Sequence, residues 1–272
     1  RHPADYLPHL IMGRQLSRVR DPKARASALA WLNRALYLFP RDPQVHLETA
    51  QALLGLGRRR QALLQFRLAL DHGAPASKVL TAALPVVRSP AEALTLLADE
   101  AESYSVAAFK LIARGRLDLA DRVVGRGRKR WPRSAEVLRA LLKLRALQGR
   151  AQEALAAGQD LVELSRTPRA YLEWARAARL VQRPDRQLAI LDRGSSYFPD
   201  DFELVKQSAT ALMKAGKLDL AAHRAQALLK STEVTEELIR THRLLSQIYR
   251  AKGRIHRAEF EADRARLLSK TQ

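Results

Sequence analysis

Residues 43–76 read PQVHLETAQALLGLGRRRQALLQFRLALDHGAPA, and this stretch is the clearest copy of the pattern on which the architecture rests. After Gly57, the residues Ala62, Phe66 and Ala69 follow one another at spacings of four and three. That spacing places them on one face of a helix. A glycine between two apolar stripes ends one helix and lets the chain turn back into the next. The stretch therefore predicts two antiparallel helices joined by a tight turn.

The same pattern returns along the chain at a nearly constant period. The turn residue recurs at intervals of 34, 33, 34 and 37 residues, at Gly115, Gly149, Gln182, Gly216 and Gly253. Five residues after each of them stands an alanine, except that Gln187 takes its place once. Self-similarity at a fixed period of this length is typical of a solenoid of stacked helical hairpins. We therefore expect function on extended surfaces rather than in one deep pocket.

Extending the period in both directions predicts a single all-α solenoid over residues 1–272, with about eight repeats behind a short linker. The expected boundaries are 1–8 for the linker and then 9–42, 43–76, 77–100, 101–134, 135–167, 168–201, 202–238 and 239–272. The third repeat is short: Pro85 interrupts its first helix, and Ser89 with Pro90 forms a start signal for its second. This repeat is either a hinge or partner notch, or a degenerate copy that bends the stack.

The composition favours helices and excludes several kinds of site. Hydrophobic residues make up 47 % of the chain, aromatic residues 6 %, and cysteine is absent. There is therefore no disulfide scaffold, thiolate metal site or cysteine nucleophile. The histidines are dispersed, and no phosphate-binding loop or nucleophile with a placed base is present, so we expect no catalysis, metal or cofactor. Trp31, Trp131 and Trp174 are assigned to helix packing. No apolar run is long enough to span a membrane.

The charge of the chain is strongly positive. There are 48 lysine and arginine residues against 28 aspartate and glutamate residues, which gives a net charge of +20. Two interpretations remain open. An arginine- and alanine-rich chain is what a GC-rich genome encodes, and such a surplus also attracts polyanions or acidic proteins. The basic runs at residues 58–60 and 126–130 are expected at hairpin turns and helix C-termini, where cations complement the helix dipole and stay solvated.

The spacing of the repeat resembles that of the tetratricopeptide repeat (TPR) family over nearly the whole chain. It is carried by Ala28, Leu32, Ala35, Pro40, Gly57, Ala62, Phe66 and Ala69. The resemblance implies a right-handed superhelix whose first helices line a concave groove that binds peptides or proteins. Many peptide-binding members hold their ligand with groove asparagines. Here Asn33 is the sole asparagine and lies on a second helix, which argues against a peptide clamp of that sort.

Helical spacing places a series of basic residues on the predicted groove face of the later repeats. They are Arg139, Lys143, Arg169, Arg176, Arg179, Lys206, Lys214, Arg240, Arg243 and Arg250. Guanidinium groups bind carboxylates and phosphates through paired hydrogen bonds, so such a face suits an acidic ligand. The alternative is that neighbouring carboxylates such as Glu173 and Asp185 neutralise these cations.

The sequence therefore predicts a non-catalytic interaction scaffold whose basic groove docks an acidic region of a partner protein. A second hypothesis follows from resemblance: a periplasmic TPR segment of a bacterial protein that makes or exports exopolysaccharide and contacts an anionic glycan. Residues 1–6 resemble a linker into such an array, so we expect a segment of a longer chain, in the periplasm or the cytoplasm. A third hypothesis is nucleic-acid binding without sequence preference, which is weakened by the scarcity of aromatic residues for base stacking.

Overall fold

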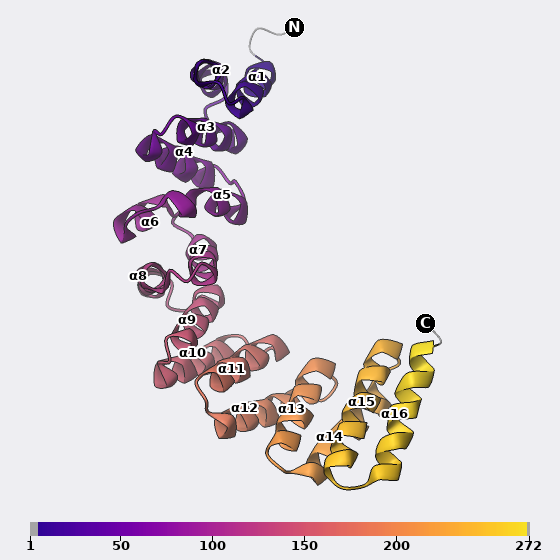
Figure 1. The fold of residues 1–272 in the computed structure, drawn as a ribbon. Coiled ribbons are helices and arrows are strands. Elements are labelled where there is room, and N and C mark those ends of the chain that lie inside the picture. The colour runs from indigo at the N-terminus through magenta and orange to yellow at the C-terminus, as the bar shows by residue number, and fades with distance from the viewer. Residues whose placement is uncertain (1–4, 271–272) are drawn as a thin grey trace. The chain divides into compact units, whose positions relative to one another are not determined.

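The computed structural model describes residues 5–270, and within them the chain forms sixteen α-helices, one short 3₁₀ helix and no strand (Figure 1). Neighbouring helices along the sequence pack in pairs. The all-α repeat architecture that the sequence predicts is confirmed. Within the described residues, no helix is both long and apolar enough to cross a bilayer.

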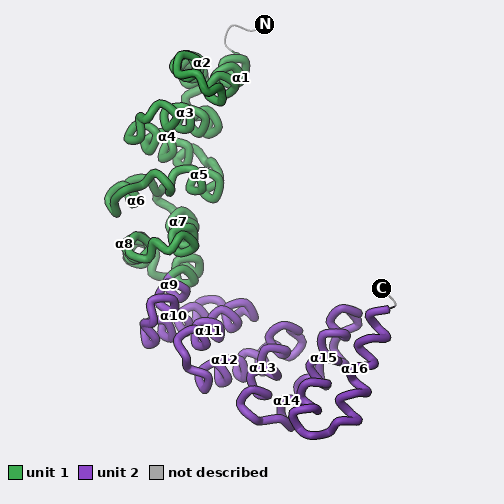
Figure 2. The backbone as a smooth tube through the Cα atoms, in the orientation of Figure 1, with its two compact units in different colours: residues 1–140 green, residues 141–272 purple. Residues whose placement is uncertain are grey.

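The chain divides into two compact units, Arg1–Ala140 and Leu141–Gln272, which we call unit 1 and unit 2 (Figure 2). Unit 1 contains α1 (Leu7–Arg18), α2 (Pro22–Leu38), α3 (Pro43–Gly55), α4 (Arg59–Asp71), α5 (Ala76–Ala83), the 3₁₀ helix η1 (Leu84–Val86), α6 (Pro90–Leu96), α7 (Ala101–Ala113) and α8 (Leu117–Arg130). The division falls inside α9 (Ala135–Leu147). Unit 2 continues with α10 (Ala151–Leu164), α11 (Pro168–Leu180), α12 (Pro184–Tyr197), α13 (Phe202–Lys214), α14 (Leu218–Ser231), α15 (Thr235–Ala251) and α16 (Ile255–Lys270).

The turns after α3, α7, α9, α11, α13 and α15 each contain one residue in the left-handed region. Gly57 has a φ of 73°, and the amide of Arg58 reaches back 2.9 Å to the carbonyl of Leu53. This hydrogen bond satisfies a carbonyl that the helix end would otherwise leave unpaired. At the corresponding turn in unit 2, Gln182 adopts a φ of 56° although its Cβ disfavours that conformation. The turn positions predicted from the repeat are thus confirmed, including the one that lacks glycine.

The first helices of several hairpins begin at a capping side chain. Asp42 accepts hydrogen bonds from the amides of Gln44 at 2.7 Å and Val45 at 2.9 Å. Thr167 and Asp201 cap α11 and α13 in the same way. Because capping satisfies amides that have no partner within the helix, these residues fix where each first helix begins.

The short third repeat is held by arginines from its neighbours. Pro85 falls in η1, where α5 ends, and Ser89 caps α6, as predicted. The Arg59 guanidinium lies 2.6 Å from the Glu92 carboxylate, and Arg116 donates hydrogen bonds to two backbone carbonyls around η1. Arg59 was predicted to be a solvated charge at a helix end, and that prediction is wrong. It forms an ion pair because the shortened repeat brings Glu92 beside it.

Two predicted boundaries differ from the structure. Helix α1 begins at Leu7, inside the stretch assigned to the linker at residues 1–8, of which residues 1–4 lie outside the described residues. Helix α15 begins at Thr235, before the predicted start at Ile239. Its first turn carries Glu236 and Glu237. Acidic residues there complement the positive end of the helix dipole, so they extend the helix toward the N-terminus.

Candidate binding surface

A cavity of about 810 Å³ lies among α11, α12 and α13 in unit 2. The residues Arg176 and Arg179 reach it from α11, and Lys206 and Lys214 reach it from α13. Asp185, near the start of α12, is the acidic residue among those that line it. We call this the basic cavity. It contains four of the cations that the sequence predicted for a groove face.

Helix periodicity explains why these four side chains meet. Arg176 and Arg179 are one turn apart on α11, and both are exposed, whereas Ala175 and Ala178 between and beside them are buried in the core. Lys206 and Lys214 are two turns apart on α13, which packs against α11. The small residues therefore lie on the packed face of α11, and the cations lie on the face that borders the cavity.

The cations of the basic cavity differ in how far they are neutralised. Lys206 lies 2.6 Å from the carboxylate of Glu203, which also accepts a hydrogen bond from Gln207. Burial acts to raise the pKa of Glu203, but the hydrogen bonds from Gln207 and Lys206 and the charge of Arg176 hold it below its usual range. The side chains of Arg176, Arg179 and Lys214 make no hydrogen bond or ion pair with any described residue. Their donors remain available.

The other predicted cations of unit 2 lie outside this cavity. Arg243 and Arg250 are exposed on α15 and make no side-chain hydrogen bond or ion pair within the described chain. Arg169 lies 2.9 Å from Glu173, and Arg240 pairs with Glu236, each within one turn of its own helix. For these two arginines, neutralisation by a neighbouring carboxylate is what the structure shows.

Two of the predicted cations lie on α9, on either side of the division between the units. Arg139 belongs to unit 1 and is half-buried. A hydrogen bond from Ser134 lowers the pKa of Glu136, and the charge of Arg139 adds to this effect. Lys143 belongs to unit 2, is exposed and interacts with a neighbouring group. Neither residue lines the basic cavity.

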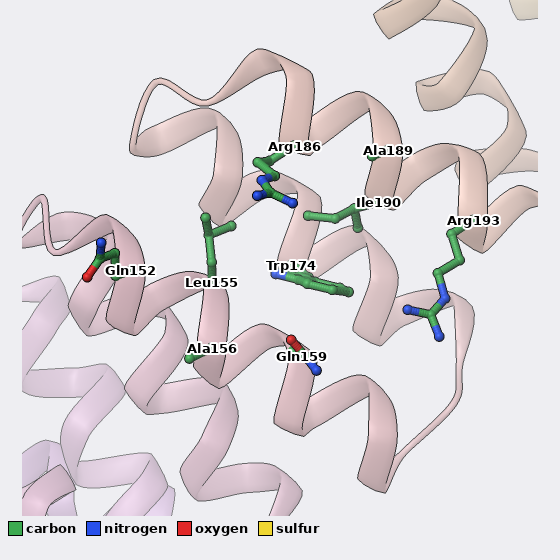
Figure 3. Close-up of a pocket in the computed structure, with 9 residues that line it drawn as sticks. All are labelled: Gln152, Leu155, Ala156, Gln159, Trp174, Arg186, Ala189, Ile190 and Arg193. Atoms are coloured by element: carbon green, nitrogen blue, oxygen red, sulfur yellow. The ribbon is translucent and has the colours of Figure 1, made fainter.

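Unit 2 contains a second cavity that the sequence pattern did not predict. It measures about 460 Å³ and lies between α10 and α12, with Trp174 of α11 at its base (Figure 3). Trp174 was predicted to take part in helix packing, and its indole does pack against Gly158. The same ring also lines an open cleft. Across residues 5–270, no group of three or more histidine and acidic side chains could hold a metal ion.

Solved structures of repeat proteins resemble this chain. The crystal structure of a MamA protein matches 62 % of this chain and 92 % of its own length, at 18 % identity and a TM-score of 0.51. MamA from Desulfovibrio magneticus RS-1 matches 65 % and 98 %, at 17 % identity and a TM-score of 0.51. A tetratricopeptide repeat protein from Parabacteroides merdae matches 97 % and 93 %, at 16 % identity and a TM-score of 0.45. No protein-family model and no curated protein matches the sequence.

Proposed function

We propose that this chain, which has the tetratricopeptide-repeat fold, is a non-catalytic interaction scaffold whose basic cavity docks an acidic segment of a partner protein. The observation that carries the proposal is the group of Arg176, Arg179 and Lys214 around one cavity, without hydrogen bonds or ion pairs to described residues. Exposed arginines bind carboxylates through two parallel hydrogen bonds, and lysine adds a point charge. An acidic segment supplies the acceptors that these donors lack.

The rest of the cavity lining favours a peptide over other polyanions. Gln187, Gln207 and Thr210 offer donors and acceptors suited to peptide groups. The carboxylate of Asp185 repels a ligand that is uniformly anionic. None of the described residues that line the cavity is aromatic, so bases would have no ring on which to stack. A ligand with a few carboxylates on an otherwise neutral backbone fits this mixture best.

The proposal is tested by measuring the affinity of a fluorescently labelled peptide rich in aspartate and glutamate. The double variant Arg176→Glu/Arg179→Glu should weaken binding by roughly tenfold or more, because it removes two attractive charges and adds two repulsive ones. The matched control is Lys217→Glu/Arg254→Glu, which reverses two exposed cations of unit 2 outside the cavity lining. An equal loss of peptide affinity in both double variants would refute a specific site. The net charge of the protein would then account for the binding.

The two alternative ligands are separated in the same assay. A polymer of uronic acids and a single-stranded oligonucleotide are each used as competitors against the labelled peptide. The proposal expects the acidic peptide to bind more tightly than either polymer at equal charge. Tighter binding of the uronic-acid polymer, lost in Arg176→Glu/Arg179→Glu, would replace the protein partner with an anionic polysaccharide.

A further inference from the structure

The cleft with Trp174 at its base has a regular lining (Figure 3). The helix α10 contributes Gln152, Leu155, Ala156 and Gln159, and the helix α12 contributes Arg186, Ala189, Ile190 and Arg193. We call this the Trp174 cleft. On both helices the lining residues stand at positions i, i+3, i+4 and i+7, so each helix presents a straight stripe along its axis. The cleft is therefore a groove between two helices.

Polar and apolar residues follow one another in the same order along the two stripes. The middle of each is apolar or small: Leu155 and Ala156 on one side, Ala189 and Ile190 on the other. Each stripe begins and ends with a polar residue, about two helical turns or roughly 10 Å apart. On α12 these end residues are arginines. The groove thus has an apolar centre with a cation at each end of one wall.

The base of the cleft carries an unpaired polar atom. The Nε1 atom of Trp174 is buried and has no hydrogen-bond partner among the described atoms. The ring lies so close to α10 that a Cβ added at Gly158 would be 2.0 Å from the indole. The indole of Trp174 therefore packs against α10 at Gly158, and the base of the groove is aromatic.

The next cleft in unit 2, between α12 and α14, is filled by the protein itself. One repeat further along the chain, Arg224 stands where Ile190 does, Ser208 where Trp174 does and Asp192 where Gln159 does. The Arg224 guanidinium bonds to Ser208 and pairs with Asp192, and Ser208 is fully buried. The Arg224 side chain thus occupies the space in this repeat that is equivalent to the open cleft beside Trp174.

We propose that the Trp174 cleft binds an amphipathic helix of a partner protein, with apolar side chains at its centre and acidic residues about two turns apart. Two observations select this occupant. A groove with i, i+3, i+4 and i+7 stripes on both walls matches the side-chain spacing of an incoming helix. Arg186 and Arg193 are exposed, have no ion pair within the described residues and face no carboxylate in the lining, so they select acidic flanks.

The test uses tryptophan fluorescence. In the variant Trp31→Phe/Trp131→Phe, Trp174 is the one remaining tryptophan of the sequence. The probe is a blocked alanine-based peptide of about 18 residues, long enough to be partly helical. It carries two central leucines four positions apart and a glutamate on either side. We expect a saturable change in Trp174 emission, and a second peptide with alanine in place of both leucines should bind at least about tenfold more weakly.

Three variants locate the binding site. Ala189→Glu places a charge in the apolar centre, and Arg186→Glu/Arg193→Glu reverses both end charges; each should weaken peptide binding by roughly tenfold or more. Both sets of positions are exposed, so thermal melting should stay close to that of the parent. The control Arg176→Glu/Arg179→Glu changes the basic cavity alone and should leave the affinity within about twofold.

Any of four results would overturn the proposal. The first is constant Trp174 emission at millimolar peptide concentration, and the second is equal affinity for the peptide without leucines. The third is a loss of binding in Arg176→Glu/Arg179→Glu as large as that in Arg186→Glu/Arg193→Glu, which would place the peptide in the basic cavity. The fourth is a concentration-dependent dimer of the free protein that Ala189→Glu abolishes, which would make a second copy the occupant.

Discussion

Three arginines of unit 1, Arg59, Arg116 and Arg130, do different work from Arg176 and Arg179 of unit 2. In unit 1, Arg59, Arg116 and Arg130 each bond to a carboxylate or to carbonyls of a neighbouring repeat. In unit 2, Arg176 and Arg179 line a cavity and bond to no described residue. The net charge of +20 is therefore not a uniform coat of solvated cations. Part of it holds repeats together, and another part is free to bind a ligand.

The shortened third repeat accounts for the structural role in unit 1. Where η1 interrupts the helix, the regular hydrogen-bond pattern ends, and the Leu84 carbonyl accepts one backbone hydrogen bond, from the Val87 amide at 3.3 Å. The Arg116 guanidinium supplies hydrogen bonds of 3.3 Å to Leu84 and 3.0 Å to Val87. The hairpins of unit 2 are full-length. Its exposed arginines therefore lie beside no interrupted helix whose carbonyl groups they would bond.

The largest effect is expected from a pair of glycines, one in each unit. Gly158→Ala should destabilise the protein by about 1–3 kcal/mol, because the new methyl group would meet the indole of Trp174 at 2.0 Å. Gly125→Ala in α8 should instead stabilise it by up to about 1 kcal/mol, because nothing lies within 4 Å of the added Cβ and alanine favours the helix. Denaturant unfolding of the two variants measures both. The same sign for both would contradict the packing described at Gly158.

The next effect separates the two kinds of arginine. Arg116→Ala should cost about 1–2 kcal/mol, because it removes charge-assisted hydrogen bonds to two carbonyls in a half-buried site. Arg179→Ala should change the stability by less than about 0.5 kcal/mol, since its side chain is exposed and unpaired. Both values come from chemical denaturation. An equal loss of unfolding free energy in Arg116→Ala and Arg179→Ala would contradict the distinction between bonded and unbonded arginines.

A gain in stability is expected at Gln182, the one non-glycine residue with a positive φ among the described residues. Gln182 has a φ of 56°, whereas the corresponding Gly57 in unit 1 has a φ of 73°. Gln182→Gly should stabilise the protein by about 0.5–1 kcal/mol, because it relieves the strain of a side chain in the left-handed region. Thermal unfolding provides the measurement. A loss of stability would mean that the glutamine side chain makes a contact worth more than the backbone strain.

The smallest effect concerns acid. The hydrogen bond from Arg59, with help from the Arg88 amide, lowers the pKa of Glu92 to about 2 from an ordinary value of 4.5. The unfolded chain therefore binds this proton more readily than the folded one. The contribution of Glu92 to stability is present above about pH 4.5 and is lost as the pH falls toward about 2. The difference in melting temperature between the parent and Glu92→Gln should shrink over that range. A difference independent of pH would contradict this assignment.

The repeat period could be read from the sequence because it depends on local rules. In most hairpins a left-handed residue follows the first helix, so Gly57, Gly115 and even Gln182 mark the turns. Helical spacing also grouped ten basic residues on one predicted face, and four of them line one cavity. The pairing of Arg169 with Glu173 and of Arg240 with Glu236 was also within reach, because each pair stands at i and i+4.

Clefts and ion pairs between repeats depend on which side chain fills a given space. The spacing of residues in the sequence does not predict this. The sequence shows Ile190 and Arg224 at equivalent positions, but not that the first leaves a cleft open and the second closes one. Likewise, the ion pair of Arg59 with Glu92 depends on how the short repeat packs. Helical period assigns a residue to a face, and packing decides whether that face is filled, bonded or free.

The most direct test of the basic cavity is the salt dependence of acidic-peptide binding. Contacts made by exposed charges weaken as salt shortens the Debye length. The affinity of the labelled acidic peptide for the parent protein should fall by roughly tenfold between about 0.05 and 0.5 M salt. The fall should be much smaller for Arg176→Glu/Arg179→Glu. An affinity that stays constant with salt, or one equally salt-sensitive in that double variant, would contradict docking at these arginines.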